Sequence, residues 1–212
     1  WGMLQTCLFK LVVPRALEPY LDADYARRNL ELVRRRSEIV KKYGMQAAVV
    51  VIDPFYLPEQ AYLDHPAWRG PRCDHPRRSR DMYFSPCIDN EEVRGLYYEA
   101  MQRLGAEVDI GFFQIITNDS GAGVCWSTGL YNGPNGPEAC RKVSMADRIV
   151  GFLQVLYDAA RSQGRETLID ITSDIFGYKA PEASMDAAWT SLKPGQLVTG
   201  RDIHGKKPVY HM

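Results

Sequence analysis

Three short apolar runs, each followed by polar residues and separated by helical patterns, constrain the fold of this chain most. Residues 47–52 (AAVVVI), 110–116 (IGFFQII) and 167–172 (TLIDIT) have the length and β-branched content of buried strands. Amphipathic helical patterns lie between them, so strand and helix alternate along the chain. Such alternation predicts an α/β fold in which a parallel sheet is built by right-handed crossovers.

The expected helices have recognisable ends. Asp22 or Asp24 can cap the first, at 25–43, and Gly44 follows its last turn. Ser144 can cap a later helix at 145–162. The other expected elements are a helix at 91–104 capped by Asp89 or Asn90, a helix at 181–192, a first strand at 6–13 and a short last strand at 207–211.

The placement of the loops narrows the fold class further. Long polar loops follow the strands, as in a (β/α)₈ TIM-type barrel, and the longest runs from 55 to 90. There is no GxGxxG or GxxxxGK[ST] motif, which disfavours a nucleotide-binding doubly wound sheet. Only four or five strand–helix units are visible, whereas a full barrel needs about 250 residues. We therefore expect residues 1–212 to form an incomplete parallel barrel, or an N-terminal or central part of one.

Composition excludes several classes of partner. The formal net charge is +0, so there is no general attraction to nucleic acid, and no run of about 18 apolar residues predicts a membrane span. The five cysteines are scattered without a CxxC pair. A metal cluster of Cys73, Asp74, His75 and Cys87 has poor spacing for zinc, so we expect reduced thiols, no metal and no cofactor.

The segment from 109 to 137 is the strongest candidate for a functional site. Its apolar strand ends abruptly in Asn118, Asp119 and small or glycine residues. Because α/β enzymes place their chemistry at the carboxyl ends of parallel strands, these polar groups are expected at the mouth of the sheet. Asp53 similarly follows the strand at 47–52. The alternative is an ordinary strand-to-helix loop in which Asp119 caps a turn.

Three stretches resemble (β/α)₈ glycoside hydrolases, most closely the α-glucuronidase family and then the hexosaminidase-like barrels. They are KKYGMQAAVVV followed by DPFYLPEQAYLDHPAWRG, the block PCIDNEEVRGLYYEAMQRL, and the strand exit QIITNDSGAG. The resemblance covers 45–171 and implies cleavage of a glycosidic bond. The family pattern at the strand exit is Asn-Ser-Glu-Gly, whose Glu is the general acid. Here Asn118 matches, but Asp119 and Ser120 occupy the next two positions, so the implied acid is Asp119.

Glycoside hydrolysis uses two carboxyl groups, one protonated and one ionised. Asp119 is the candidate acid, and Asp170 or Asp174 is the candidate for the ionised partner, with Asp53 as a third possibility. Because side chains alternate along a strand, Asp170 and Asp174 share one face while isoleucines occupy the other. Alternatively, Asp170 is a core residue bound to a lysine or arginine, and Asp174 lies in a solvated loop.

Several other residues are candidates for binding a carbohydrate ligand. Trp126, Tyr131 and Trp68 have rings that can stack on a sugar face, although packing beneath their own loops is the usual role of single aromatics. Arg69 can pair with a substrate carboxylate or with a structural acid, and Asn118 can bind hydroxyl groups or brace a turn. A non-catalytic carbohydrate-binding barrel is the competing function. A metal-dependent isomerase or aldolase would need histidines at strand ends, which the sequence lacks.

Overall fold

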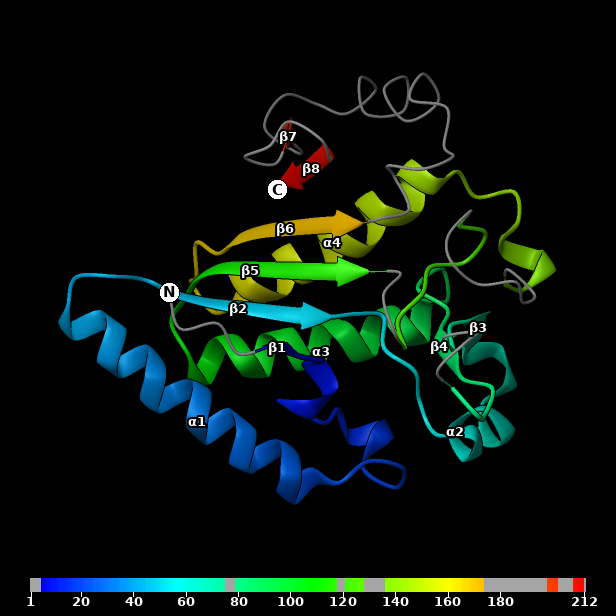
Figure 1. Ribbon diagram of the computed structural model, residues 1–212, viewed down its shortest axis with the longest axis horizontal. Helices are drawn as coiled ribbons and strands as arrows, with labels where there is room; N and C mark the ends of the chain where they lie inside the picture. The colour runs from blue at the N-terminus through cyan, green and yellow to red at the C-terminus, as the bar shows by residue number, and fades with distance from the viewer. Residues whose placement is uncertain are drawn as a thin grey trace.

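The computed structural model describes residues 5–74, 79–117, 121–127, 136–173, 198–201 and 208–211. Its central feature is a parallel sheet in which β5 (Ile110–Thr117) lies between β2 (Ala47–Ile52) and β6 (Leu168–Ser173). The short β1 (Gln5–Thr6) pairs parallel with β2. At the other edge β8 (Pro208–His211) and β7 (Val198–Arg201) add antiparallel, giving the order β1-β2-β5-β6-β8-β7 (Figure 1).

The predicted barrel is wrong. In the part of the chain that the structure describes, the sheet is open, with β1 and β7 at opposite edges and an antiparallel pair beside β6. The fold is a mixed α/β fold, and the resemblance to (β/α)₈ glycoside hydrolases is not supported by it. The reason is that strand–helix alternation predicts parallel pairing equally for an open sheet and for a barrel. Closure depends on how many strands join and at which edge they pair.

The three long helices begin where the sequence predicts. Helix α1 (Ala23–Lys42) is capped by Asp22, α3 (Glu91–Glu107) by Asn90, and α4 (Met145–Ser162) by Ser144. In each case the capping side chain accepts a hydrogen bond from a backbone N–H of the first turn, at 2.8 Å in α1 and 3.1 Å in α3 and α4. None of the described helices combines the length and the apolar character needed to cross a membrane.

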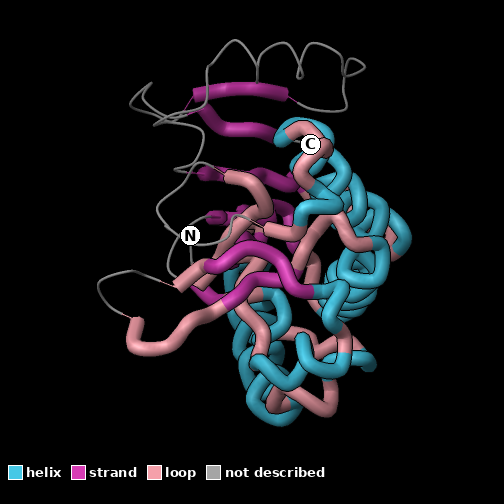
Figure 2. Tube along the Cα trace, turned by 90° about the vertical axis from the view of Figure 1, so that its right-hand side faces the viewer, coloured by secondary structure: helices cyan, strands magenta, loops and turns pink. Residues whose placement is uncertain are grey.

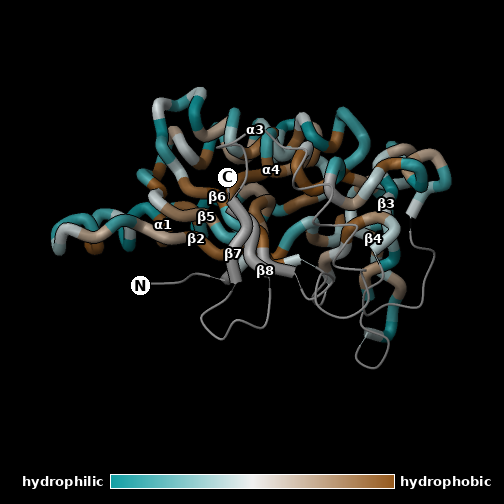
Figure 3. Tube along the Cα trace, turned by 90° about the horizontal axis from the view of Figure 1, so that it is seen from above, coloured by the Kyte–Doolittle hydropathy of each residue, from teal (hydrophilic) through white to brown (hydrophobic). Residues whose placement is uncertain are grey.

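The core forms where the helices pack against one face of the sheet. Figure 2 shows the helices on one side of the strands, and Figure 3 shows hydrophobic residues concentrated where β5 and β6 meet α4. As the alternation predicts, Ile169 and Ile171 are fully buried in this core, together with Phe113 and Ile115 of β5. Burial of each such side chain contributes about 1.5–3 kcal/mol, so this face is the main source of stability.

Two segments differ from the prediction. The expected strand at 6–13 is a strand only at Thr6, because the chain then turns into the short 3₁₀ helix η1 (Leu8–Lys10), where the Leu11 N–H donates to the Leu8 carbonyl oxygen at 2.9 Å. The expected long loop, 55–90, is folded. It contains α2 (Glu59–Asp64), η3 (Pro66–Trp68) and a hairpin of β3 (Arg69–Arg72) with β4 (Phe84–Pro86), held by the buried Tyr62 and Trp68.

Replacing a glycine by alanine should have opposite effects on stability in this hairpin and in helix α3. A Cβ at Gly70 in β3 would lie 2.6 Å from the Ser85 carbonyl oxygen and 2.9 Å from the Cys87 nitrogen. Gly70→Ala should therefore destabilise the protein by about 1–3 kcal/mol. Gly95, within α3, has open space around that position, so Gly95→Ala should stabilise by about 0.5–1 kcal/mol. Urea unfolding measures both, and equal effects would contradict the hairpin packing.

Candidate functional site

The carboxyl ends of β2, β5 and β6 meet at one edge of the sheet. Ile52 is in register with Ile116, and Thr117 with Ser173, so the three strands end almost level. The polar residues singled out in the sequence follow these ends directly. Asp53 is described by the structure. Four other predicted site residues, Asn118, Asp119, Tyr131 and Asp174, lie outside the described residues.

Asp53 lies beneath this edge and is only 1% exposed. Its carboxylate accepts hydrogen bonds from the Leu8 N–H at 2.8 Å, the Phe55 N–H at 3.2 Å and the Tyr97 hydroxyl at 3.1 Å. Burial raises the pKa of Asp53 to about 7, and the three hydrogen bonds oppose this shift. Both oxygens are therefore engaged by protein groups, and the residue ties the N-terminal turn to the end of β2.

Asp170 is part of the sheet and not of its edge. It lies opposite Gln114 in the β5–β6 pairing, and the Gln114 Nε2 donates to Asp170 Oδ2 at 2.9 Å. Its side chain is buried, three residues before the end of β6. This arrangement corresponds to the alternative role of a hydrogen-bonded core residue, and Gln114 is one of its partners.

The side chains of Trp68 and Arg69 are held by neighbours within the loop between β2 and α3. Trp68 is 3% exposed, stacks on His65 with ring centroids 3.8 Å apart, and donates to Glu92 at 2.6 Å. Arg69 forms an ion pair with Glu59, and its guanidinium lies over the rings of Tyr62 and Phe84. Trp68 thus has the packing role weighed in the sequence, and Arg69 pairs with a structural acid.

Trp126 is half-buried and lies near the same edge as Asp53. Its indole Nε1 donates to the Pro137 carbonyl oxygen at 2.9 Å, and the Arg141 guanidinium lies 5.0 Å from the ring centroid. Its φ of +58° is in the left-handed region, which non-glycine residues rarely occupy. The backbone is therefore held in a specific conformation immediately after Cys125.

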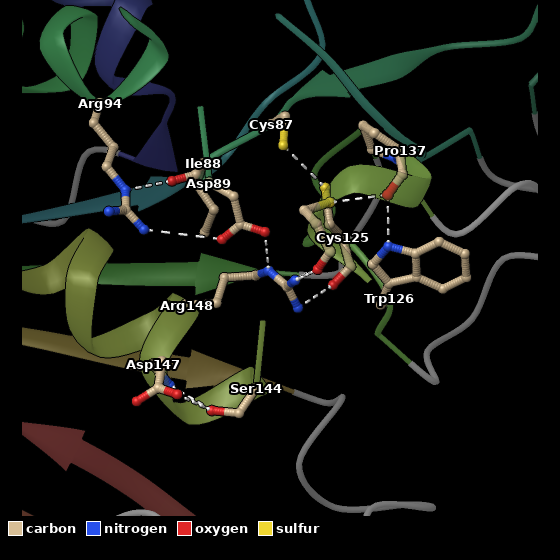
Figure 4. Close-up of polar contacts among 11 residues, drawn as sticks. Cys87, Ile88, Asp89, Arg94, Cys125, Trp126, Pro137, Ser144, Asp147 and Arg148 are labelled. Atoms are coloured by element: carbon tan, nitrogen blue, oxygen red, sulfur yellow. Dashed lines mark hydrogen bonds and ion pairs between the residues drawn. The ribbon is translucent and has the colours of Figure 1, made fainter. Parts of the chain in front are cut away.

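Near this edge the structure also assembles a cluster that the sequence did not reveal, which we call the thiol cluster: Cys87, Asp89, Cys125 and Cys140. One ligand atom from each of these residues lies within 4.8 Å of all the others. Cys87 and Asp89 lie in the turn between β4 and α3, Cys125 in the loop after β5, and Cys140 at the end of η4 (Glu138–Cys140). Figure 4 shows the sulfur atoms of Cys87 and Cys125 facing each other and the nearby Asp89 carboxylate turned toward Arg148 and Arg94.

Arg148 of α4 holds this cluster together. Its Nε pairs with Asp89 Oδ2 at 2.7 Å, while its Nη1 and Nη2 donate to the carbonyl oxygens of Cys125 and Cys140 at 2.8 and 2.6 Å (Figure 4). The residue is 1% exposed. The other oxygen, Asp89 Oδ1, is buried without a hydrogen bond, and its nearest cation is Arg94 Nη2 at 3.9 Å.

The pKa values of the three thiols are shifted in different directions. Cys125 donates a hydrogen bond to Cys87 across 3.5 Å, and this bond lowers the pKa of the Cys87 thiol to about 6. The same bond, together with burial, raises the pKa of Cys125. Burial raises the pKa of Cys140 to about 11, and its Sγ contacts the Pro137 carbonyl oxygen at 3.2 Å. Three sulfur atoms and one carboxylate form a donor set suited to a soft or borderline divalent ion.

Of the metal cluster that was weighed and disfavoured in the sequence, only Cys87 belongs to the thiol cluster. Cys73 lies elsewhere and donates to the Gly121 carbonyl oxygen at 3.3 Å, and Asp74 pairs with Arg72 at 2.5 Å. His75 lies outside the described residues. The true neighbours of Cys87 come from distant loops, so spacing along the chain carried no signal for them. All five cysteines are free and buried.

No protein-family model matches the chain, and no curated protein matches it significantly.

Proposed function

We propose that the chain hydrolyses a glycosidic bond at the edge formed by the carboxyl ends of β2, β5 and β6. The observation that carries the proposal is the level register of these strands, each of which is followed within two residues by an aspartate: Asp53, Asp119 and Asp174. Neighbouring strands are about 4.8 Å apart. Carboxyl groups after such strands can be separated by about 5–10 Å, the range used in two-carboxylate glycoside hydrolysis.

In this proposal, Asp119 donates the proton to the leaving oxygen and Asp174 is the ionised partner. Asp53 and Asp170 have positioning roles, because their carboxylates are already bound to protein groups below the edge. The half-buried ring of Trp126 is the aromatic surface on which a sugar stacks. Binding outside the carboxyl ends of parallel strands is the usual location for ligands in open α/β sheets.

The test is Asp119→Asn, assayed against a panel of aryl glycosides and uronides. Loss of the titrating group should lower the hydrolysis rate by about 10²–10⁴-fold. The free energy of unfolding should change by less than about 0.5 kcal/mol, because asparagine keeps the shape of the side chain and removes only the titrating group. The exposed Asp81, changed to asparagine, is the matched control and should retain full activity.

Two results would contradict the proposal: no glycoside hydrolysed by the unaltered chain, or undiminished hydrolysis by Asp119→Asn. Binding of a sugar without turnover, detected by calorimetry and weakened by Trp126→Ala, would instead support the non-catalytic carbohydrate-binding function.

A further inference from the structure

We propose that Cys87, Asp89, Cys125 and Cys140 bind one divalent ion of the zinc class, through three thiolates and one carboxylate. The inference is independent of glycoside hydrolysis, because neither the ligands nor the ion takes part in the proposed reaction. It assigns a chemical role to the thiol cluster.

The first support is the spacing of the donor atoms. In tetrahedral zinc sites the Zn–S distance is about 2.3 Å, which separates two sulfur ligands by about 3.8 Å. The sulfur atoms of Cys87 and Cys125 are 3.5 Å apart, and all four donor atoms lie within 4.8 Å of one another. Small side-chain rotations are enough to enclose an ion, with no rearrangement of the backbone.

The second support is an unsatisfied atom. Asp89 Oδ1 is buried, in a side chain that is 7% exposed, and accepts no hydrogen bond. Arg94 forms an ion pair with this oxygen, but at 3.9 Å it is too far away to donate a hydrogen bond, so the oxygen still has a lone pair available to a bound ion or water. The other oxygen is oriented by Arg148, which fixes the carboxylate beside the three sulfur atoms.

The charges of the surrounding groups are also those that a bound divalent ion requires. Three thiolates and one carboxylate carry four negative charges, and a divalent ion together with two guanidinium groups carries four positive ones. Arg148 pairs with one oxygen of Asp89, and Arg94 forms a longer ion pair, at 3.9 Å, with the other. Because isolated charges are costly to bury, this balance allows all four ligands to be deprotonated away from water.

Arg148 acts as a positioning residue outside the ligand set. It contacts three of the four ligand residues, through the Asp89 carboxylate and the carbonyl oxygens of Cys125 and Cys140. Hydrogen bonds of this kind orient the ligands of metal sites. Gly136 supplies the space that Cys125 needs, since a Cβ there would lie 2.9 Å from the Cys125 Cβ and 3.0 Å from its sulfur.

Simple packing of apolar thiols does not account for the cluster. Cys7 and Cys73 are also buried and free, but each lies near a single carboxylate, Asp53 or Asp74, and neither belongs to a group of three or more possible ligands among the described residues. Packing alone gives no reason for a carboxylate and a guanidinium to be buried among the sulfur atoms at 87, 125 and 140. The ion would join the β4–α3 turn to the two segments between β5 and α4, and so stabilise the loops near the candidate edge.

The experiment is titration of the reduced, metal-stripped chain with Co²⁺ and then Zn²⁺. One equivalent of Co²⁺ should bind with the absorption of a tetrahedral site and an intense sulfur-to-cobalt charge-transfer band, and Zn²⁺ should abolish both. Cys125→Ser and Cys140→Ser should each weaken binding on the order of a hundredfold or more. Cys73→Ser, which changes a buried free thiol outside the cluster, is the control and should bind the ion normally.

Three outcomes would overturn the inference: no stoichiometric binding by the folded chain, a pale octahedral cobalt spectrum without the charge-transfer band, or equal weakening by Cys73→Ser. If the cysteine variants do not fold, the charge-transfer intensity of the unaltered chain decides the question, since it increases with the number of thiolate ligands. All these measurements are made without a sugar substrate, so they fail or succeed separately from the hydrolase proposal.

Discussion

Arg148→Met is expected to lower the free energy of unfolding by about 3–5 kcal/mol in the reduced, metal-free chain. Methionine keeps much of the length and apolar volume of the side chain but removes every donor. Asp89 then loses its 2.7 Å ion pair, and the carbonyl oxygens of Cys125 and Cys140 lose their donors. Removing one partner of a buried ion pair is costly because the remaining charge stays buried without compensation. Urea unfolding followed by circular dichroism measures the loss.

Two comparisons separate this mechanism from a general packing defect. Arg148→Met combined with Asp89→Asn removes both charges, so about 1–3 kcal/mol of the loss should be recovered. Arg94→Met is the matched control, since Arg94 is more exposed and lies 3.9 Å from Asp89. Its loss should be no more than about 1–2 kcal/mol, mainly from the hydrogen bond to the Ile88 carbonyl oxygen. A loss below about 1 kcal/mol for Arg148→Met would contradict the proposed role.

The parts of the fold that follow from local sequence were predictable. The caps Asp22, Asn90 and Ser144 precede amphipathic runs, and the observed helices start directly after them. The central strands were found because continuous apolar runs of six to eight residues are typical of buried parallel strands. Such signals depend on residues a few positions apart, which is why they survive without knowledge of the tertiary fold.

Features that depend on distant contacts were not predictable. The N-terminal apolar run was interpreted as a strand, but Leu8 is held in a helical turn by a hydrogen bond to Asp53, 45 residues away. Closure of the sheet was inferred from element order alone, which does not encode edge pairing. The thiol cluster joins Cys87 to Cys125 across 38 residues, through a loop whose backbone is irregular at Trp126.

For the candidate site residues too, features set by local sequence were predictable and features set by distant contacts were not. The sequence correctly put Asp53 at the end of a strand, because Pro54 and the preceding apolar run mark that end. It did not reveal that Tyr97 and Leu8 would enclose the carboxylate, since both come from other elements. Trp68 was a candidate by residue type, whereas its exposure is set by the stacking contact with His65. The residue type shows which interactions a side chain can make, and the tertiary contacts decide which of them it does make.

Because Asp53 is enclosed by protein groups, the free energy of unfolding should depend strongly on pH. The pKa of Asp53 is about 7 in the folded chain and about 4 when unfolded. Between these values the folded chain keeps a proton that the unfolded chain has released. The free energy of unfolding should therefore fall as pH rises from about 4 to about 7, then level off. A difference of about 3 pKa units corresponds to about 4 kcal/mol over this window.

Asp53→Asn should remove this slope, because an amide does not titrate. The variant should be less stable than the unaltered chain near pH 4, since one oxygen that accepts from Leu8 or Phe55 becomes an amide NH₂. The difference should shrink toward pH 7.5, where the unaltered chain carries the buried charge.

Tyr97→Phe is the matched control: it deletes one hydrogen bond to the charged form, so the slope should persist and extend to higher pH. Carboxylates whose pKa is lowered, such as Asp64, are common to all three proteins and cancel in the comparison. Urea unfolding at several pH values between 4 and 8 gives the three curves, and an identical slope in Asp53→Asn would show that another group carries the proton.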